Sequence, residues 1–262
     1  MNLELTGKHV LVTGGSRGIG LACARAFGAE GARVSIVSKR RESVDTALKD
    51  LKGRGIACAG FDADLTDAQA AERIVGGAEQ AHGPIDVLVN SAGAARRTPF
   101  AELTAPDWHD AMDQKFFTYV HVMTPVVARM ARRGTGTVVN VIGAGGKVAS
   151  TTHLAGGAAN AALMLVTAGL AAAWASQGVR VNAVNPGLTL TDRMAEGFRA
   201  DARQQGISED EARARAEKRL PMGRIATPEE IADAVLWLAS ARASYVNGAI
   251  LAMDGAVAPI VV

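Results

Sequence analysis

A glycine-rich turn near the start of the chain has the spacing of a phosphate-binding loop. In the stretch VLVTGGSRGIG, Gly14 follows a short apolar run, and Gly18 and Gly20 open a helical one. Gly14 allows a tight turn, while Gly18 and Gly20 let the backbone and a helix N-terminus come close to a pyrophosphate. Glycine also serves ordinary turns, but this place directly after a first strand favours a dinucleotide site.

A basic cluster after the second apolar run indicates which dinucleotide fits. The run RVSIVS ends in SKRR, and no carboxylate follows it before Glu42. An acid at this point binds the ribose hydroxyls of NAD, whereas basic groups accommodate the 2′-phosphate of NADP. The alternative is a set of ordinary exposed residues after a strand. The sequence therefore predicts an NADP(H) site whose phosphate meets these side chains: Arg17, Ser38, Lys39 and Arg40.

The elements that must position these residues alternate between short apolar runs and segments of helical length. Strands are expected within 9–14, 33–38, 56–64, 85–93, 137–143, 179–187 and 248–255, and helices over 19–30, 42–52, 68–82, 106–132, 153–177 and 228–240. Such alternation predicts an α/β, Rossmann-type doubly wound parallel sheet that spans 1–262 as a single domain. Ligands of such sheets bind at the carboxyl ends of the strands.

One polar segment, 191–219, interrupts this alternation. It is rich in charge and has helical composition, so a solvated surface excursion is one interpretation. Because it comes just after a strand end, we expect a lid-like helical insertion over the site.

Composition limits the class of protein. The chain has 262 residues and a net charge of +2, with acids between the basic residues, so we expect no nucleic-acid partner. Cys23 and Cys58 lack metal-ligand spacing, and we expect no metal site. No basic head precedes an apolar run at the N-terminus, which favours a cytoplasmic protein. The uncharged stretch 154–179 has the length of a membrane helix, but its Ala and Gly content predicts a buried helix and no membrane partner.

Motifs along nearly the whole chain resemble those of the short-chain dehydrogenase/reductase family. TGGSRGIG looks like its Thr-Gly-x-x-x-Gly-x-Gly turn, DADLTD like its adenine-contacting segment, NSAG like its Asn-Asn-Ala-Gly, and NPGLTLTD like its Pro-Gly turn and threonine. The resemblance implies a Rossmann fold of about seven strands, usually assembled as a tetramer. It also implies cofactor contacts from Gly14, Ser16, Arg17, Gly18, Ile19, Gly20, Ser38, Lys39, Arg40, Asp64, Leu65, Asn90, Ala92, Gly93, Pro186, Gly187, Thr189 and Thr191.

The family's usual catalytic residues are absent. In the common mechanism a tyrosine gives a proton to the carbonyl, a lysine four residues later lowers its pKa, a serine orients the substrate and a helix asparagine supports a proton relay. No tyrosine occurs between positions 120 and 243. The runs GTVVNVIG and NAALMLVTAGLA on either side of the site fix the register, so the serine, tyrosine and lysine positions fall on Gly143, Gly156 and Asn160. The asparagine position, in DQKFFTY on the long helix, falls on Lys115.

Three side chains are candidates for the missing proton donor. Lys115 is expected in the space left by the absent lysine, where an ammonium group could polarise a carbonyl or hold the nicotinamide ribose, and burial would lower its pKa. Tyr119, one turn on, is expected on the same face, with a core tyrosine as the alternative. His153 begins the next helix and could donate near neutral pH, or simply be exposed.

Two classes of function remain open. The first is an NADP(H)-dependent oxidoreductase with a non-standard active site, acting on a carbonyl or alcohol or on a conjugated C=C bond, with a small-molecule substrate. The second is a catalytically silent, cofactor-binding partner or regulator. The glycine turn with Asp64, Asn90 and Thr189 favours the enzyme, and the four changed positions favour the alternative. We expect a homotetramer assembled through the 106–132 and 153–177 helices and the apolar tail 256–262.

Overall fold

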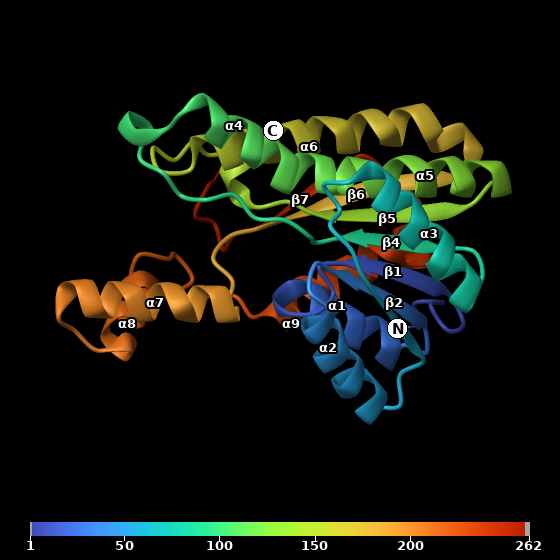
Figure 1. Ribbon diagram of the computed structural model, residues 1–262, viewed down its shortest axis with the longest axis horizontal. Helices are drawn as coiled ribbons and strands as arrows, with labels where there is room; N and C mark the ends of the chain where they lie inside the picture. Colours follow the sequence, from blue (N-terminus) through green and yellow to red (C-terminus); the bar gives the residue numbers. More distant parts are fainter. Residues whose placement is uncertain (1, 260–262) are drawn as a thin grey trace.

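Parallel strands form the centre of the molecule (Figure 1). The computed structural model describes residues 2–259, without the side chains at positions 193, 196, 200, 201 and 204. Within these residues lies a seven-stranded parallel sheet of order β3-β2-β1-β4-β5-β6-β7. The prediction of a doubly wound sheet is therefore confirmed. The strands are β1 (His9–Thr13), β2 (Arg33–Ser38), β3 (Cys58–Asp62), β4 (Val87–Asn90), β5 (Gly136–Val141), β6 (Val179–Pro186) and β7 (Ile250–Met253).

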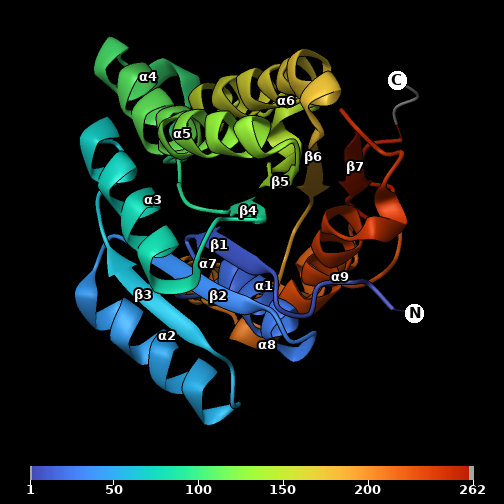
Figure 2. The ribbon, with the colours of Figure 1, turned by 90° about the vertical axis from the view of Figure 1, so that its right-hand side faces the viewer.

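Helices cover both faces of the sheet (Figure 2). Alternate strand residues face opposite sides, so Val10 and Val12 of β1 belong to one core and Leu11 to the other. The first core packs against α1 (Gly18–Ala29), α2 (Arg41–Gly53) and α9 (Pro228–Ala239), and the second against α3 (Ala68–His82), α5 (Thr118–Arg133) and α6 (Leu154–Trp174).

The long apolar helix α6 is one layer of this fold. Its span with the following short helix, Leu154–Gln177, is long and apolar enough to cross a membrane by length and composition. However, α6 packs against β6 and the segment after β5, and it buries Leu163 and Ala171 in the second core. Leu165, on its outer face, is 76% exposed.

The segment predicted as one helix over 106–132 has three parts. A short helix, α4 (Ala105–Ala111), begins at a capping box made by Thr104 and Asp107. A π-helical turn, Met112–Phe117, follows, and α5 completes the segment. The Thr118 hydroxyl donates to the carbonyls of Gln114 and Lys115, at 3.3 and 3.2 Å, and so helps to satisfy the wider turn.

Two helices project from the body as a separate small unit (Figure 1). They are α7 (Asp192–Gln205) and α8 (Glu209–Glu217), within the predicted insertion. Thr191 caps α7 and Ser208 caps α8. Phe198, Ala202, Ala212 and Ile225 form a small apolar cluster between them, so the unit has its own core. We call it the α7–α8 unit.

Candidate functional site

A cavity of about 490 Å³ opens at the carboxyl ends of the central strands. It lies where the strand order reverses, between β1 and β4, which is the usual ligand crevice of open parallel sheets. Most of the residues expected to contact a cofactor line it: Gly14, Ser16, Arg17, Gly18, Ile19, Ser38, Lys39, Asp64, Leu65, Ala92, Gly93, Pro186, Gly187, Thr189 and Thr191.

The glycine turn after β1 brings three backbone segments together. Gly14 has a positive φ of 66°, and a Cβ there would lie 2.7 Å from the Ser91 carbonyl oxygen. Gly20 lies outside the cavity lining, because it packs α1 onto the turn: a Cβ would lie 2.7 Å from the carbonyl carbon of Gly14. As a result, the first turn of α1 abuts the cavity, with Gly18 and Ile19 in its wall.

A basic and polar group lies at the end of the cavity near β2 and β3. Ser16 donates to the Ser38 hydroxyl at 2.8 Å. Lys39 Nζ is 2.6 Å from a carboxylate oxygen of Asp64, and this contact lowers the pKa of Asp64. Arg40, the extended residue before α2, is not in the cavity wall, so its contact with a phosphate stays a prediction.

Asn90 supports the cavity from behind. It is fully buried, and its amide donates to Asn140 Oδ1 at 3.0 Å. Thr13 donates to Asn90 Oδ1 at 3.3 Å, and the Thr13 hydroxyl in turn accepts from the backbone N–H groups of Ser91 and Ala92. Asn90 therefore fixes the loop that lines the cavity. Asn90 itself does not line the cavity, although it was expected among the cofactor contacts.

Lys115 lies at the other end of the cavity, on the π-helical turn. Gly93, with a φ of 116°, lets the loop after β4 pack directly on this turn, because a Cβ would overlap the Gln114 carbonyl oxygen. Lys115 Nζ is 5.7 Å from the centroid of the Tyr119 ring. Gly143 also lines the cavity. The Asn160 amide nitrogen lies 3.3 Å from where a Cβ on Gly143 would stand.

Tyr119 is a core residue, which corrects its place among the candidate acids. The side chain is fully buried, and its hydroxyl donates to the Val141 carbonyl oxygen at 2.6 Å. Burial raises the pKa of the phenol. Tyr119 is on the same helical face as Lys115, but its side chain packs in the second core, where the Val141 carbonyl oxygen accepts its hydroxyl proton.

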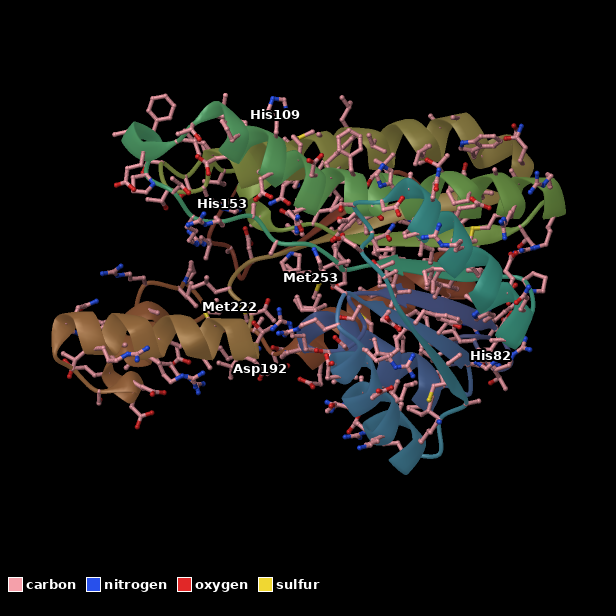
Figure 3. The ribbon with its side chains drawn as sticks, in the orientation of Figure 1. His82, His109, His153, Asp192, Met222 and Met253 are labelled. Atoms are coloured by element: carbon pink, nitrogen blue, oxygen red, sulfur yellow. The ribbon has the colours of Figure 1, made fainter. Side chains whose placement is uncertain are left out.

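His153 is half-buried and lies outside the cavity lining, so neither a simple exposed position nor a place in the cavity wall describes it. It precedes α6, and Gly145, Gly156 and Ala95 surround its ring. Burial lowers the pKa of this imidazole, and the charges of Arg97 and Lys115 lower it further. In Figure 3, His153 lies on the side from which α7 and α8 project, as do Asp192 and Met222.

Sequence motifs missed part of the cavity wall. Most of these residues lie next to motif positions near strand ends, and that position is the sequence signal by which they could have been found. The residues are Val37, Ala63, Ser91, Ala94, Gln114, Thr118, Val141, Gly143, Asp192 and Met194.

Comparison with known proteins decides the family. The family described as Enoyl-(Acyl carrier protein) reductase matches residues 14–257. A D-threitol dehydrogenase of Mycolicibacterium smegmatis is 35% identical, with 97% of this chain and 94% of the relative covered. The chain belongs to the short-chain dehydrogenase/reductase family. Membership indicates an NAD(P)-dependent oxidoreductase of alcohols or carbonyl compounds.

Solved structures resemble this short-chain dehydrogenase/reductase along its length. An actinorhodin polyketide ketoreductase with NADPH has a TM-score of 0.92 and 32% identity, covering 97% of this chain and 98% of its own. A short-chain oxidoreductase from Pseudomonas aeruginosa, bound to NADPH and described as having an atypical catalytic centre, has a TM-score of 0.90 and 28% identity, covering 98% and 99%.

Replacing Tyr119 by Phe tests its assignment to the core. The variant loses the hydroxyl and leaves the Val141 carbonyl oxygen without this donor, so we expect about 1–3 kcal/mol less stability towards urea. Because the phenol has no catalytic part, turnover at permissive temperature should stay within about 3-fold of wild type. A large loss of turnover with unchanged stability contradicts the assignment.

Proposed function

We propose that this protein is an NADP(H)-dependent oxidoreductase with a non-standard active site, acting on an alcohol or carbonyl compound or on a conjugated C=C bond. The carrying observation is one cavity with the glycine turn at one end and Lys115 at the other. Such an arrangement can hold a dinucleotide and leave a charged group at the reacting end.

The residues of the cavity fit a dinucleotide. Gly14 and Gly18 line the cavity beside the first turn of α1, where free N–H groups favour an anion such as a pyrophosphate. Asp64 and Leu65 would contact the adenine, and Arg17 and Lys39 would meet a 2′-phosphate. When bound, the dinucleotide supplies hydride transfer.

Lys115 would supply positive charge at the reacting end. Its ammonium lines the cavity at a point where the usual family members keep an asparagine, opposite Gly143. A fixed cation there stabilises negative charge that develops on a substrate oxygen, or it holds the nicotinamide ribose. Gly143 presents no side chain to the cavity that it lines.

The α7–α8 unit would serve as the lid over this site. Thr191, Asp192 and Met194 belong to the cavity wall, while most of the unit projects from the body. Because its own apolar cluster holds the two helices together, the unit can move as one body about its connections to the sheet.

A second function is dinucleotide binding without turnover, as in a regulatory partner. The replacement of the usual serine, tyrosine and lysine by Gly143, Gly156 and Asn160 favours it. The enzyme is the better-supported function because Lys115 lies in the cavity wall.

We expect tighter binding of NADPH than of NADH. Arg17→Ala and Lys39→Ala should each raise the Kd for NADPH by about 10-fold or more through loss of a charge-assisted contact, and leave the Kd for NADH within about 3-fold. Fluorescence titration measures both values. Arg40→Ala is the matched variant and should have the smaller effect, since Arg40 lies outside the cavity wall. Equal affinities of the wild type for the two dinucleotides contradict the proposal.

Lys115→Ala should abolish turnover while leaving NADPH binding within a few-fold. The reason is loss of the cation at the reacting end, which typically costs 100-fold or more in rate, on the order of 3 kcal/mol. Absorbance of NADPH is followed with a panel of alcohols, ketones and enones. Lys49→Ala, at an exposed position on α2, is the control and should behave as wild type. A wild type that binds NADPH and turns over none of the panel supports the silent alternative.

We further propose a homotetramer. Leu165 on α6, Trp108 on α4 and Phe117 on the π-helical turn are 76%, 38% and 37% exposed, and they would supply apolar contacts between subunits. The end of the apolar tail, 260–262, lies outside the described residues. Light scattering should give about four chain masses, and Leu165→Asp should lower the mass. A monomer at micromolar concentration contradicts this assembly.

A further inference from the structure

The ring of His153 occupies space that a side chain at position 156 would need. A Cβ on Gly156 would lie 2.6 Å from His153 Nε2 and 2.7 Å from the Cβ of Ala95, and it would overlap His153 Cε1. Any residue other than glycine at position 156 therefore excludes this ring position. Gly145 forms another side of the niche, since its Cβ would lie 3.2 Å from His153 Cδ2.

The niche contains polar atoms that the protein does not satisfy. Among the side chains that the structure describes, His153 Nδ1 and Asn160 Oδ1 are buried and lack a hydrogen-bond partner. Asn160 is only 2% exposed, and its Nδ2 would lie 3.7 Å from a Cβ on Gly145, so it borders the same niche. Unpaired buried polar atoms are rare in native proteins and mark places where a substrate group or water binds.

We propose that His153 is the group that exchanges the proton of the substrate oxygen, and that Gly156 is required because it makes room for the imidazole. This inference rests on the proposed function. In alcohol oxidation His153 would take the hydroxyl proton, and the O–H electron pair would become the second bond of the C=O product. The C–H electron pair would leave with the hydride, which a bound dinucleotide would accept. The protonated ring then returns its proton to water. Lys115 holds the developing alkoxide by charge, and Asn160 is a positioning residue beside the ring.

The charges around the His153 ring favour its neutral, proton-accepting form at neutral pH. The effects of Arg97 and Lys115 both lower the pKa of His153, with burial as the larger cause and the Arg96 backbone opposing them. A folded pKa below the ordinary value of about 6.5 leaves the ring neutral at pH 7, which is the proton-accepting form. Titratable and charged residues on the segments packed around the niche are Arg96, Arg97, Lys115, Lys147, the exposed Asp113, and Asp107, His109 and Asp110 of α4.

The test compares three variants of the full chain: His153→Gln, Gly156→Ala and Gly169→Ala. Gly169 is the matched control, because it lies in α6 with open space around its Cβ position. D-threitol and secondary alcohols are oxidised with NADP⁺, and the corresponding ketones are reduced with NADPH. We expect His153→Gln and Gly156→Ala to lose about 100- to 10,000-fold in kcat with NADPH affinity within about 3-fold, and Gly169→Ala to match wild type.

Two further readouts separate catalysis from packing. For wild type, kcat/KM of oxidation should rise as pH increases through the His153 pKa and then level off, and this inflection should be absent from His153→Gln. By NMR of labelled histidine, the His153 pKa should lie below about 6.5 in wild type and move up towards that value in Gly156→Ala, as the ring leaves the niche.

The outcomes distinguish this inference from the proposed function. Activity of His153→Gln within about 3-fold of wild type overturns the role of His153 and leaves the oxidoreductase standing. Gly156→Ala with unchanged activity and unchanged His153 pKa overturns the requirement for glycine. A wild type that turns over none of the substrates overturns the proposed function, and the proton-exchange role falls with it.

Discussion

Close contact between backbone segments at the centre of the sheet is the constraint on which the site depends. The turn after β1 touches the loop after β4 at Gly14 and Ser91, and α1 touches the same turn at Gly20. Side chains at either glycine would push these segments apart. Buried hydrogen bonds from Thr13 and Asn90 then fix the loop, so hydrogen-bonded backbone holds this part of the cavity wall in place.

The absence of side chains has a second consequence at the reacting end. Glycine at positions 143, 145 and 156 removes three Cβ atoms from a small volume, and the ring of His153 and the amide of Asn160 occupy it. These positions are therefore coupled through packing. A larger side chain at position 156 would stand where the imidazole now lies.

Charge divides the cavity into two ends. Near β2 and β3, Lys39 is paired with Asp64, so a 2′-phosphate would have to compete with this carboxylate for the ammonium group. At the reacting end, Arg97 and Lys115 act on His153 without an opposing carboxylate among the groups that shift its pKa. A neutral imidazole is the result, and an anion on the substrate is favoured there by the same charges.

By itself the sequence determined the alternation of strands and helices, the glycine turn and the family, because these depend on local periodicity and on residues close in the chain. Packing decided the rest. Tyr119 and Lys115 share one helical face, yet only the tertiary structure shows that the phenol is buried on Val141 while Lys115 lines the cavity. The niche of His153 likewise joins Ala95, Gly145 and Gly156, from three separate segments, and distances between such segments arise only when the chain folds.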